Sequence, residues 1–195
     1  LPMLHLLSKR KIKAYGFDID DSKIKLLKSG LSYISDIKSE HLKIIDKRNL
    51  YNMKNLEKIK KINYLIICLP TPFTKKRPDI SRITSAFKRL TPFLRKNQTI
   101  ILESTVYPGA TKEIFYKGLS KKFKVGTNFF LCYSPERLSP GQTDKKLFKY
   151  FLDNTTKVIS GYNYLSLQKV NFLYKKIFDK LCKVESLEIA EMSKL

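Results

Sequence analysis

The residues best placed to do chemistry follow directly after two apolar runs. The first run, TIILEST, ends in Thr105, and the second, NFFLCYS, is followed by Pro135, Glu136 and Arg137. In a parallel sheet covered by helices, strands are continuous apolar runs, and ligands bind just beyond their carboxyl ends. The sequence therefore predicts that a hydroxyl group and a carboxylate open onto one crevice.

Glu136 has two interpretations at this stage. The neighbouring Arg137 could keep its carboxylate ionised in the crevice, because an opposite charge nearby favours the charged form. Alternatively, the carboxylate caps a helix or forms an ion pair, and a single carboxylate does not separate these cases. The residues after Thr105, YPGATKEI, predict a turn and a new helix. The first N–H groups of that helix could face an anionic ligand.

A second acidic position ends an earlier predicted strand, KIKAYGFDID. Asp18 lies inside this strand, whereas Asp20, Asp21 and Ser22 lie where they can cap the following helix. In a dinucleotide-binding βαβ unit, the acidic residue at the end of the second strand accepts hydrogen bonds from the adenosine ribose hydroxyls. Ribose binding is therefore the favoured interpretation of Asp18.

Motifs spaced along the whole chain resemble the UDP-glucose/GDP-mannose dehydrogenase family; in order they are GFDID, CLPTP, ESTVYPG, YSPER and AEMSK. These NAD-dependent enzymes oxidise the C6 hydroxyl of a nucleotide-linked sugar to a carboxylate. The paired PER and PG pattern is most similar to the branch that acts on UDP-N-acetylhexosamines. Such spaced motifs are more specific than a lone GxGxxG. The resemblance implies NAD as cofactor and UDP-N-acetylglucosamine or UDP-N-acetylmannosamine as substrate.

The resemblance also implies which residues bind the cofactor. They are Asp18, Lys23, Pro70, Thr71 and Thr105. Lys23 matches a family position near the adenosine, and CLPTP matches a segment that lines the cofactor. Prolines also stop a strand and make a rigid turn, so this segment can serve both purposes.

Catalytic roles follow from the same resemblance. In the family, the Thr of the STV motif and the Glu of the SPE motif lie beside the reacting C6 carbon. There they position a water and help to hydrolyse a thioester intermediate. Thr105 and Glu136 inherit these roles by position, and Glu136 and Arg137 are expected to contact the substrate.

Lys194 is the third catalytic candidate. Glu188, Glu191 and Lys194 recur every three residues and so share a helix face, where surface ion pairing is the plain interpretation. The AExxK pattern, however, resembles the start of the family's long central helix. In that helix the Lys stabilises the oxyanion that develops on C6, and the resemblance favours this role for Lys194.

The predicted fold is a Rossmann-like, doubly wound α/β domain with a mostly parallel sheet and helices on both faces. Leu1-Pro2 matches the end of the family's GxGYVGLP signature, so the first strand and the Gly-rich loop are expected to be missing. In the 3-2-1-4-5-6 strand order that strand is the central one. Residues 1–183 are expected to form the NAD-binding domain, and residues 184–195 to begin the central connecting and dimerisation helix.

Apolar runs and breaker residues locate the expected elements. Helices are predicted over 1–10, 22–30, 80–94 and 164–180, after Gly109 and from residue 187. Strands are predicted over 11–20, 41–46, 62–73, 99–105, 128–134, 157–161 and 180–187.

Cysteine usage fits a reducing, cytoplasmic setting. The three cysteines are widely spaced and predict neither a disulfide framework nor a metal site, and each is expected to be buried and inert. None of Cys68, Cys132 and Cys182 has the GGHCIP-type context of the family's nucleophile. The resemblance therefore implies that the nucleophile lies beyond Leu195, in a larger, homodimeric enzyme, and that the fragment alone is inactive.

Two other functions remain open. A related β-hydroxyacid-type NAD dehydrogenase would carry its catalytic groups on a helical C-terminal domain. The formal net charge of +22 could also indicate a basic module that binds nucleic acid without catalysis. The lysines, however, are spread along the chain, so a Lys-rich solvated surface without a nucleic-acid partner is preferred. No apolar run approaches the roughly 18 residues of a membrane span, and no membrane association is expected.

Overall fold

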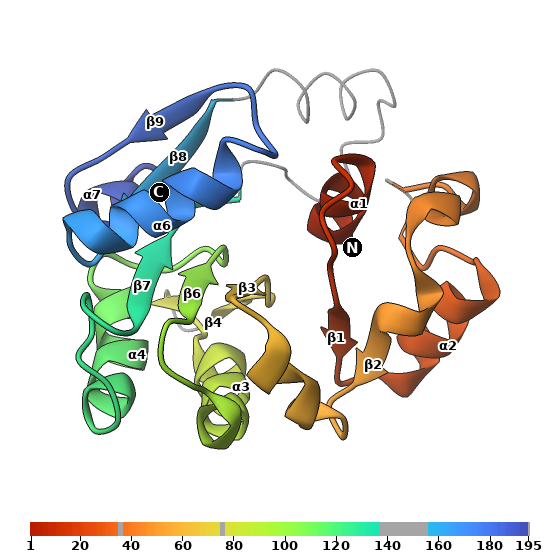
Figure 1. Cartoon of the computed structure of the whole chain (residues 1–195), viewed down its shortest axis with the longest axis horizontal. Coiled ribbons are helices and arrows are strands. Elements are labelled where there is room, and N and C mark those ends of the chain that lie inside the picture. The colour runs from red at the N-terminus through yellow and green to blue at the C-terminus, as the bar shows by residue number, and fades with distance from the viewer. Residues whose placement is uncertain (35–36, 75–76, 137–155, 195) are drawn as a thin grey trace. The chain divides into compact units, whose positions relative to one another are not determined.

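The computed structural model describes residues 1–34, 37–74, 77–136 and 156–194, without the side chains of 73–77. The described residues fall into two compact units (Figure 1). The first unit contains the described residues up to 56, and the second contains the described residues from 57 onwards.

The first unit packs short helices against two strands. Its elements are α1 (Pro2–Lys9), β1 (Gly16–Asp18), α2 (Asp21–Ser29), two 3₁₀ helices (Ser39–Ile44 and Lys47–Asn49) and β2 (Leu50–Asn52). As expected, Asp20 caps the start of α2, and its carboxylate accepts a hydrogen bond from the N–H of Ser22 at 2.9 Å. Gly30 ends it in a left-handed conformation with φ of 83°. Apolar side chains of α2, the longer 3₁₀ helix and β2 form the core of this unit.

One strand prediction in this unit was wrong. Residues 41–46 lie not in a strand but largely in the 3₁₀ helix Ser39–Ile44. Leu42 and Ile45 are buried while Ile44 is half exposed, a spacing of three that suits a 3₁₀ turn and not the alternation of a strand. The strand comes later, at β2, which pairs in parallel with β1 and places Leu50 opposite Gly16.

The second unit contains a sheet of five strands, in the order β3 (Tyr64–Ile67), β6 (Thr99–Leu102), β7 (Phe130–Tyr133), β8 (Lys157–Gly161) and β9 (Leu181–Lys183). Each neighbouring pair is parallel except β7 and β8, which are antiparallel. The prediction of a mostly parallel sheet is confirmed. A short hairpin of β4 (Phe73–Thr74) and β5 (Arg77–Pro78) was not expected from the sequence.

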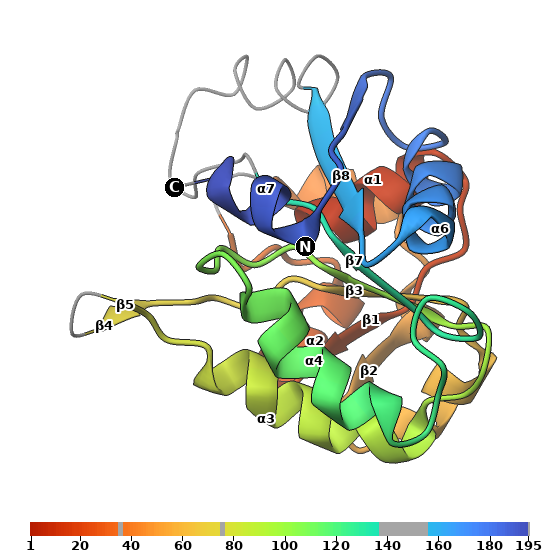
Figure 2. The ribbon, with the colours of Figure 1, turned by 90° about the vertical axis from the view of Figure 1, so that its left-hand side faces the viewer.

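Helices cover both faces of this sheet. They are α3 (Ser81–Leu90), α4 (Ala110–Ser120), α6 (Tyr164–Tyr174), which is shorter than predicted, and α7 (Leu187–Met192). Figure 2 shows α3 and α4 on one side of β3, β6 and β7, with α6 on the other side. Every residue of β6 and β7 is buried, which explains why both strands are continuous apolar runs.

The parallel strands form separate sheets, β1–β2 and β3–β6–β7–β8–β9. Among the described residues no strand pairs with both β1 and β3. The fold is therefore Rossmann-like α/β, as the sequence predicted.

Replacement of Gly161 by Ala should destabilise the second unit. A Cβ atom at this last residue of β8 would lie 2.2 Å from the backbone nitrogen of Leu167 and 2.7 Å from the carbonyl carbon of Ser166. Backbone cannot move aside as a flexible side chain can, so we expect a loss of about 1–3 kcal/mol in the free energy of unfolding. Urea denaturation measures it, with Leu165→Ala on the exposed face of α6 as the control. An unchanged unfolding midpoint for Gly161→Ala would contradict the close approach of β8 and α6.

Candidate active site at the strand ends

Three of the predicted site residues follow neighbouring strands of the second unit. Thr71 comes after β3, Thr105 after β6 and Glu136 after β7. These strands are adjacent and parallel, so their carboxyl ends lie at one edge of the sheet. All three residues are partly buried. Topology therefore brings them to a common edge, together with the exposed Pro70.

Two further predicted residues lie close together in the first unit. Asp18 ends β1, and its carboxylate accepts a hydrogen bond from the N–H of Asp20 at 3.0 Å. Lys23, in the first turn of α2, places its ammonium 5.3 Å from the centre of the Tyr33 ring. Burial raises the pKa of Tyr33, and the carboxylates of Asp18 and Asp20 raise it further. Sequence reasoning missed Tyr33, which lies in a segment without a recognisable motif.

The remaining site predictions concern Arg137 and Lys194. Arg137 lies outside the described residues. Lys194 is partly buried and follows the last turn of α7, where its N–H donates to the carbonyl of Glu191. The roles of all these residues remain predictions.

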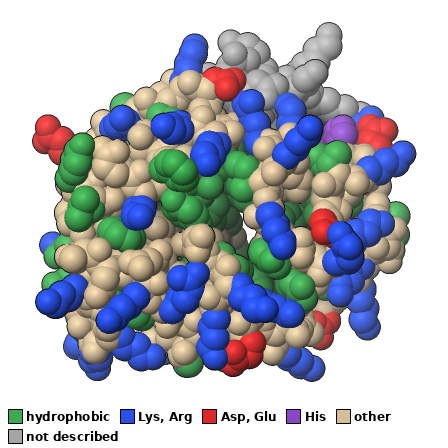
Figure 3. All heavy atoms as spheres, in the orientation of Figure 1, with side chains coloured by type: hydrophobic (Ala, Val, Ile, Leu, Met, Phe, Trp, Pro, Cys, Tyr) green, Lys and Arg blue, Asp and Glu red, His purple; other side chains and the backbone are tan. Residues whose placement is uncertain are grey.

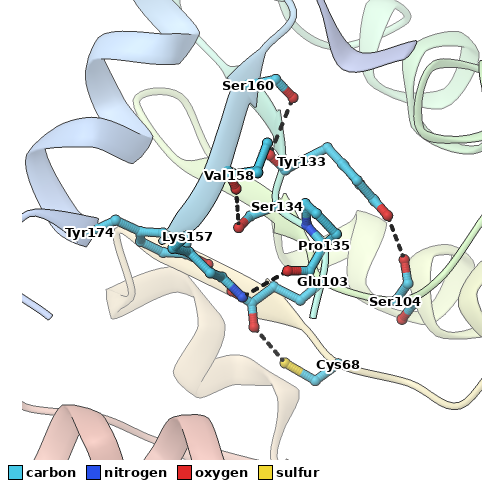
Figure 4. A network of polar contacts seen from close by, with 10 residues as sticks. All are labelled: Cys68, Glu103, Ser104, Tyr133, Ser134, Pro135, Lys157, Val158, Ser160 and Tyr174. Carbon is cyan, nitrogen blue, oxygen red and sulfur yellow. Dashed lines mark hydrogen bonds and ion pairs between the residues drawn. The ribbon is translucent and has the colours of Figure 1, made fainter. Parts of the chain in front are cut away.

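Hydroxyl groups hold the backbone around Thr105. The Ser104 hydroxyl donates to the carbonyl of Leu69 at 2.7 Å and accepts from the N–H of Leu69 at 3.0 Å. The Tyr133 hydroxyl donates to the Ser104 carbonyl at 3.2 Å (Figure 4). These bonds join β3, β6 and β7 beyond the last residues of β3 and β6, so the backbone that carries Thr105 is held from both sides.

A buried ion pair lies directly beneath this edge. The Lys157 ammonium is 3.1 Å from the Glu103 carboxylate, and the two residues are 4% and 2% exposed. Tyr174, on α6, donates its hydroxyl to the same carboxylate, and the Cys68 thiol approaches it at 3.6 Å (Figure 4). Because every partner comes from a different element, the network ties β3, β6, β8 and α6 together.

The same ammonium reaches the segment that carries Glu136. Lys157 donates to the carbonyl of Pro135 at 3.1 Å. Burial by itself lowers the pKa of Lys157, but the carboxylates of Glu103 and Glu136 raise it, and the net shift is upward. Burial raises the pKa of Glu103, and Lys157 offsets part of that rise. We conclude that Lys157 is an ammonium ion, since its head group has anionic and carbonyl oxygens as acceptors.

Glu191 does not take part in the surface ion pairing expected from its spacing. It is fully buried, and its carboxylate accepts hydrogen bonds from the N–H of Gly109 and, at 2.8 Å, from that of Thr111. These N–H groups belong to the start of α4, where the sequence suggested a site for an anionic ligand. The carboxylate of the chain itself takes that place, and the bonds fasten α7 to α4.

The cysteines agree with expectation in part. Cys132 is buried in β7, where burial raises the pKa of its thiol. Cys68 and Cys182 are exposed residues, so the expectation of burial was wrong for both, although the Cys68 thiol itself lies against Glu103, where burial and that carboxylate raise its pKa. Cys68 comes just after the last residue of β3, and Cys182 lies in β9, at the edge of the sheet.

Comparison with known families identifies the chain. The family model described as "UDP-glucose/GDP-mannose dehydrogenase family, NAD binding domain" matches residues 1–178. The chain belongs to this family. The matched part is the NAD-binding domain, so NAD is the cofactor that its residues serve.

Curated members of the UDP-glucose/GDP-mannose dehydrogenase family are similar over most of this chain. Protein CapL of Staphylococcus aureus is 34% identical over 189 residues, which is 95% of this chain and 43% of that protein. The UDP-N-acetyl-D-glucosamine 6-dehydrogenase of Salmonella typhi is 34% identical over 92% of this chain and 42% of its own length. The chain thus spans less than half the length of these relatives.

Solved structures of the family share the fold. The UDP-N-acetyl-mannosamine dehydrogenase Cap5O from Staphylococcus aureus superposes with a TM-score of 0.86 at 25% identity, covering 100% of this chain and 46% of its own. The UDP-D-ManNAc dehydrogenase from Pyrococcus horikoshii gives a TM-score of 0.85 at 25% identity, covering 99% of this chain and 46% of its own.

The described residues fit NAD at the adenosine end. Asp18 ends a parallel strand with its carboxylate partly buried, and one of its oxygens is oriented by the Asp20 N–H. An oriented carboxylate at this position suits ribose hydroxyl groups. Within the described residues no group of three or more His, Cys, Asp and Glu side chains could hold a metal ion. Nor is any described helix long and apolar enough to cross a membrane.

Replacement of Glu191 by Ala should destabilise the junction of α4 and α7. The N–H groups of Gly109 and Thr111 would lose their charged acceptor in a buried place, at a cost of about 1.5–3 kcal/mol. Chemical denaturation measures this cost. The matched control is Glu188→Ala on the same helix, which should change stability by less than about 0.5 kcal/mol. Equal losses from the two variants would show that Glu191 has no capping role.

Replacement of Lys157 by Met should cost about 3–5 kcal/mol at neutral pH, because Glu103 would be left as an unpaired buried charge. The pKa of Lys157 is raised in the folded chain, from an ordinary value of 10.5. Its contribution to stability is therefore fully present below pH 10.5 and is lost as the pH rises through the higher folded pKa. Urea denaturation should be measured at a pH below 10.5 and at a pH above the folded pKa of Lys157. The difference in unfolding free energy between wild type and variant should be smaller at the higher pH. A difference independent of pH would contradict the ion pair.

Proposed function

We propose that this chain is the NAD-binding part of an enzyme that oxidises the C6 hydroxyl of a UDP-N-acetylhexosamine to the uronic acid. One observation carries the proposal: Thr105 and Glu136 follow adjacent parallel strands, β6 and β7, in a chain whose family is established. In such a sheet both residues point beyond the same edge, where ligands bind.

The cofactor residues have separate tasks in this proposal. Bound NAD accepts hydride from the sugar, and the protein positions the two reactants. Asp18 and Lys23 hold the adenosine end, supported by their closeness around Tyr33 in the first unit. Pro70, Thr71 and Thr105 line the cofactor at the sheet edge of the second unit. The hydroxyl bonds of Ser104 support this role, because they keep the backbone on either side of the edge in place.

The catalytic assignment follows the family resemblance. Thr105 and Glu136 position the water that hydrolyses the thioester, and Glu136 and Arg137 contact the substrate. Lys194 stabilises the oxyanion on C6. Support for Lys194 comes from Glu191, which fastens the preceding turns of α7 to the start of α4, a few residues after Thr105. The nucleophilic Cys belongs to the part of the family's length that this chain does not span.

The substrate class is drawn from the relatives. Two are named UDP-N-acetyl-D-glucosamine 6-dehydrogenase and several others UDP-N-acetyl-D-mannosamine dehydrogenase. These sugars differ only in configuration at C2, so we propose the shared class, a UDP-linked N-acetylhexosamine. A β-hydroxyacid-type substrate has weaker support. The 3-hydroxyisobutyrate dehydrogenase of Mycobacterium tuberculosis matches at a TM-score of 0.63 and 12% identity, a likeness of fold alone.

A homodimer in the cytoplasm is the proposed setting of the complete enzyme. The free thiols of Cys68, Cys132 and Cys182 are consistent with a reducing compartment. Nucleic acid is not a proposed partner, because the lysines are spread along the whole sequence and do not form one block. On the face drawn in Figure 3, Lys and Arg side chains are scattered and form no single dense patch. A nucleic-acid footprint concentrates them on one face or along one stripe.

The complete gene product should reduce NAD when given UDP-N-acetylglucosamine or UDP-N-acetylmannosamine. NADH absorbance measures the reaction, with UDP-glucose as the comparison substrate. In that enzyme, Asp18→Asn should raise the KM for NAD by about 10- to 100-fold, because a charged acceptor of ribose hydrogen bonds is lost.

The control for Asp18 is Asp21→Asn, an exposed carboxylate on the first turn of α2. It should leave the KM for NAD unchanged. A gene product that binds neither NAD nor any sugar nucleotide would overturn the proposed function, and equal effects of the two variants would remove Asp18 from the cofactor site.

A further inference from the structure

The strand β8 enters the sheet from the side of the candidate site. Because β8 is antiparallel to β7, with Cys132 opposite Gly161 and Tyr133 opposite Ser160, its first residue lies near the carboxyl end of β7. A parallel strand would have placed that residue at the opposite edge. The first residue of β8 is Lys157, and this reversal of direction is the reason that a lysine from outside the sequence motifs reaches the site.

Side-chain bonds fix the start of β8 against the segment that leads to Glu136. The Ser134 hydroxyl donates to the carbonyl of Val158 at 2.7 Å, and Lys157 donates to the carbonyl of Pro135 at 3.1 Å (Figure 4). Proline has no N–H, so the Ser134–Pro135 peptide offers no donor, and the next peptide, Pro135–Glu136, is the one whose carbonyl Lys157 binds. The ammonium bond to its carbonyl therefore orients the peptide that immediately precedes Glu136.

The other contact of the ammonium is with the neighbouring strand. Glu103 is the first residue after β6 and stands two residues before Thr105. Lys157 thus connects the end of β6 to the end of β7 through one head group, at 3.1 Å from each acceptor. The hydroxyl of Tyr174, on α6, also donates to the Glu103 carboxylate, so the position of this carboxylate is itself fixed by a hydrogen bond.

We propose that Lys157 is a positioning residue for the hydrolytic step, holding the backbone of Glu136 at a set place relative to Thr105. The inference rests on the proposed function, since it takes Thr105 and Glu136 as the groups that position the water. Stability alone does not account for the arrangement. A buried ion pair commonly contributes no more to stability than apolar side chains of similar volume would. What the ammonium adds is a directed bond to the Pro135 carbonyl.

The step that depends on this positioning is hydrolysis of the thioester. The water oxygen forms a bond to the acyl carbon, and the bond between that carbon and the cysteine sulfur breaks. One proton of the water goes to the sulfur and the other to solvent, so the products are the carboxylate and the thiol. Nothing is oxidised or reduced in this step, because both hydrides have already been transferred to two NAD molecules.

A matched pair of double variants of the complete enzyme tests the proposal. In both, Glu103→Gln removes the negative charge while leaving an acceptor for Tyr174. The first variant adds Lys157→Met, which removes the donor to the Pro135 carbonyl. The second adds Lys157→Gln, whose amide can still donate to it. Lys169→Met, which removes an exposed lysine above the Phe130 ring, is the control for loss of a positive charge.

We expect Glu103→Gln/Lys157→Met to lower kcat by about 10- to 100-fold, with little change in the KM for NAD or sugar nucleotide. Rapid mixing should show a fast burst of NADH followed by a slow steady state, and mass spectrometry should detect the enzyme with the acyl group attached. Glu103→Gln/Lys157→Gln should recover most of the rate, and Lys169→Met should behave as wild type.

Different outcomes separate failure of the inference from failure of the proposed function. A wild-type enzyme that forms no NADH with any UDP-sugar defeats the proposed function and the inference with it. An active wild type, with equal kcat in the two folded double variants, defeats the inference alone. If the Met variant does not fold, Glu103→Met/Lys157→Met/Tyr174→Phe removes both charges of the ion pair and the hydroxyl that donates to the Glu103 carboxylate. Wild-type kcat in that variant would equally show that Lys157 has no positioning role.

Discussion

The ion pair of Glu103 and Lys157 is the interaction on which the second unit depends. It lies where the parallel strands β3, β6 and β7 meet the antiparallel strand β8, and it also engages α6 through Tyr174. A charge in such a place is costly unless it is paired and hydrogen-bonded. Each acceptor and donor in the network has its partner, so the strand ends cannot shift separately without exposing a buried charge.

This constraint links the packing of the sheet to the candidate chemistry. Each residue proposed to act on the sugar directly follows a residue that is fixed by a hydrogen bond inside the protein. Ser104 precedes Thr105, and Pro135 precedes Glu136. Thr105 and Glu136 are partly buried, while the residues before them, Ser104 and Pro135, are buried. A rigid support directly behind a more accessible side chain is the arrangement that a positioned hydrolytic water requires.

At the start of α4 the sequence correctly predicts that an anion binds to the N–H groups, but it does not predict that the anion is a side chain of the protein itself. Helix N-termini attract anions, and the sequence after Pro108 indicates a helix start near the expected ligand site. The structure contains an anion there, but it is the carboxylate of Glu191, 80 residues after Thr111 in the chain. The consequence is that α7 is attached to the edge of the sheet that carries Thr105. Local pattern alone could not identify which carboxylate would fill the position.

The sequence by itself determined the α/β class, most of the strands and the edge at which Thr71, Thr105 and Glu136 meet. Apolar runs that end in Pro, Gly and polar residues indicate a buried strand and the place where it ends. Both are local properties of the sequence. Tertiary structure decided the rest: the 3₁₀ helix at Ser39–Ile44, the burial of Glu191, and the partnership of Glu103 with Lys157, 54 positions apart in the numbering. The physical reason is that charged side chains carry no periodic signal of their own. Whether one is solvated, caps a helix or is buried in a pair depends on which distant strand lies beside it, and here on the reversed direction of β8.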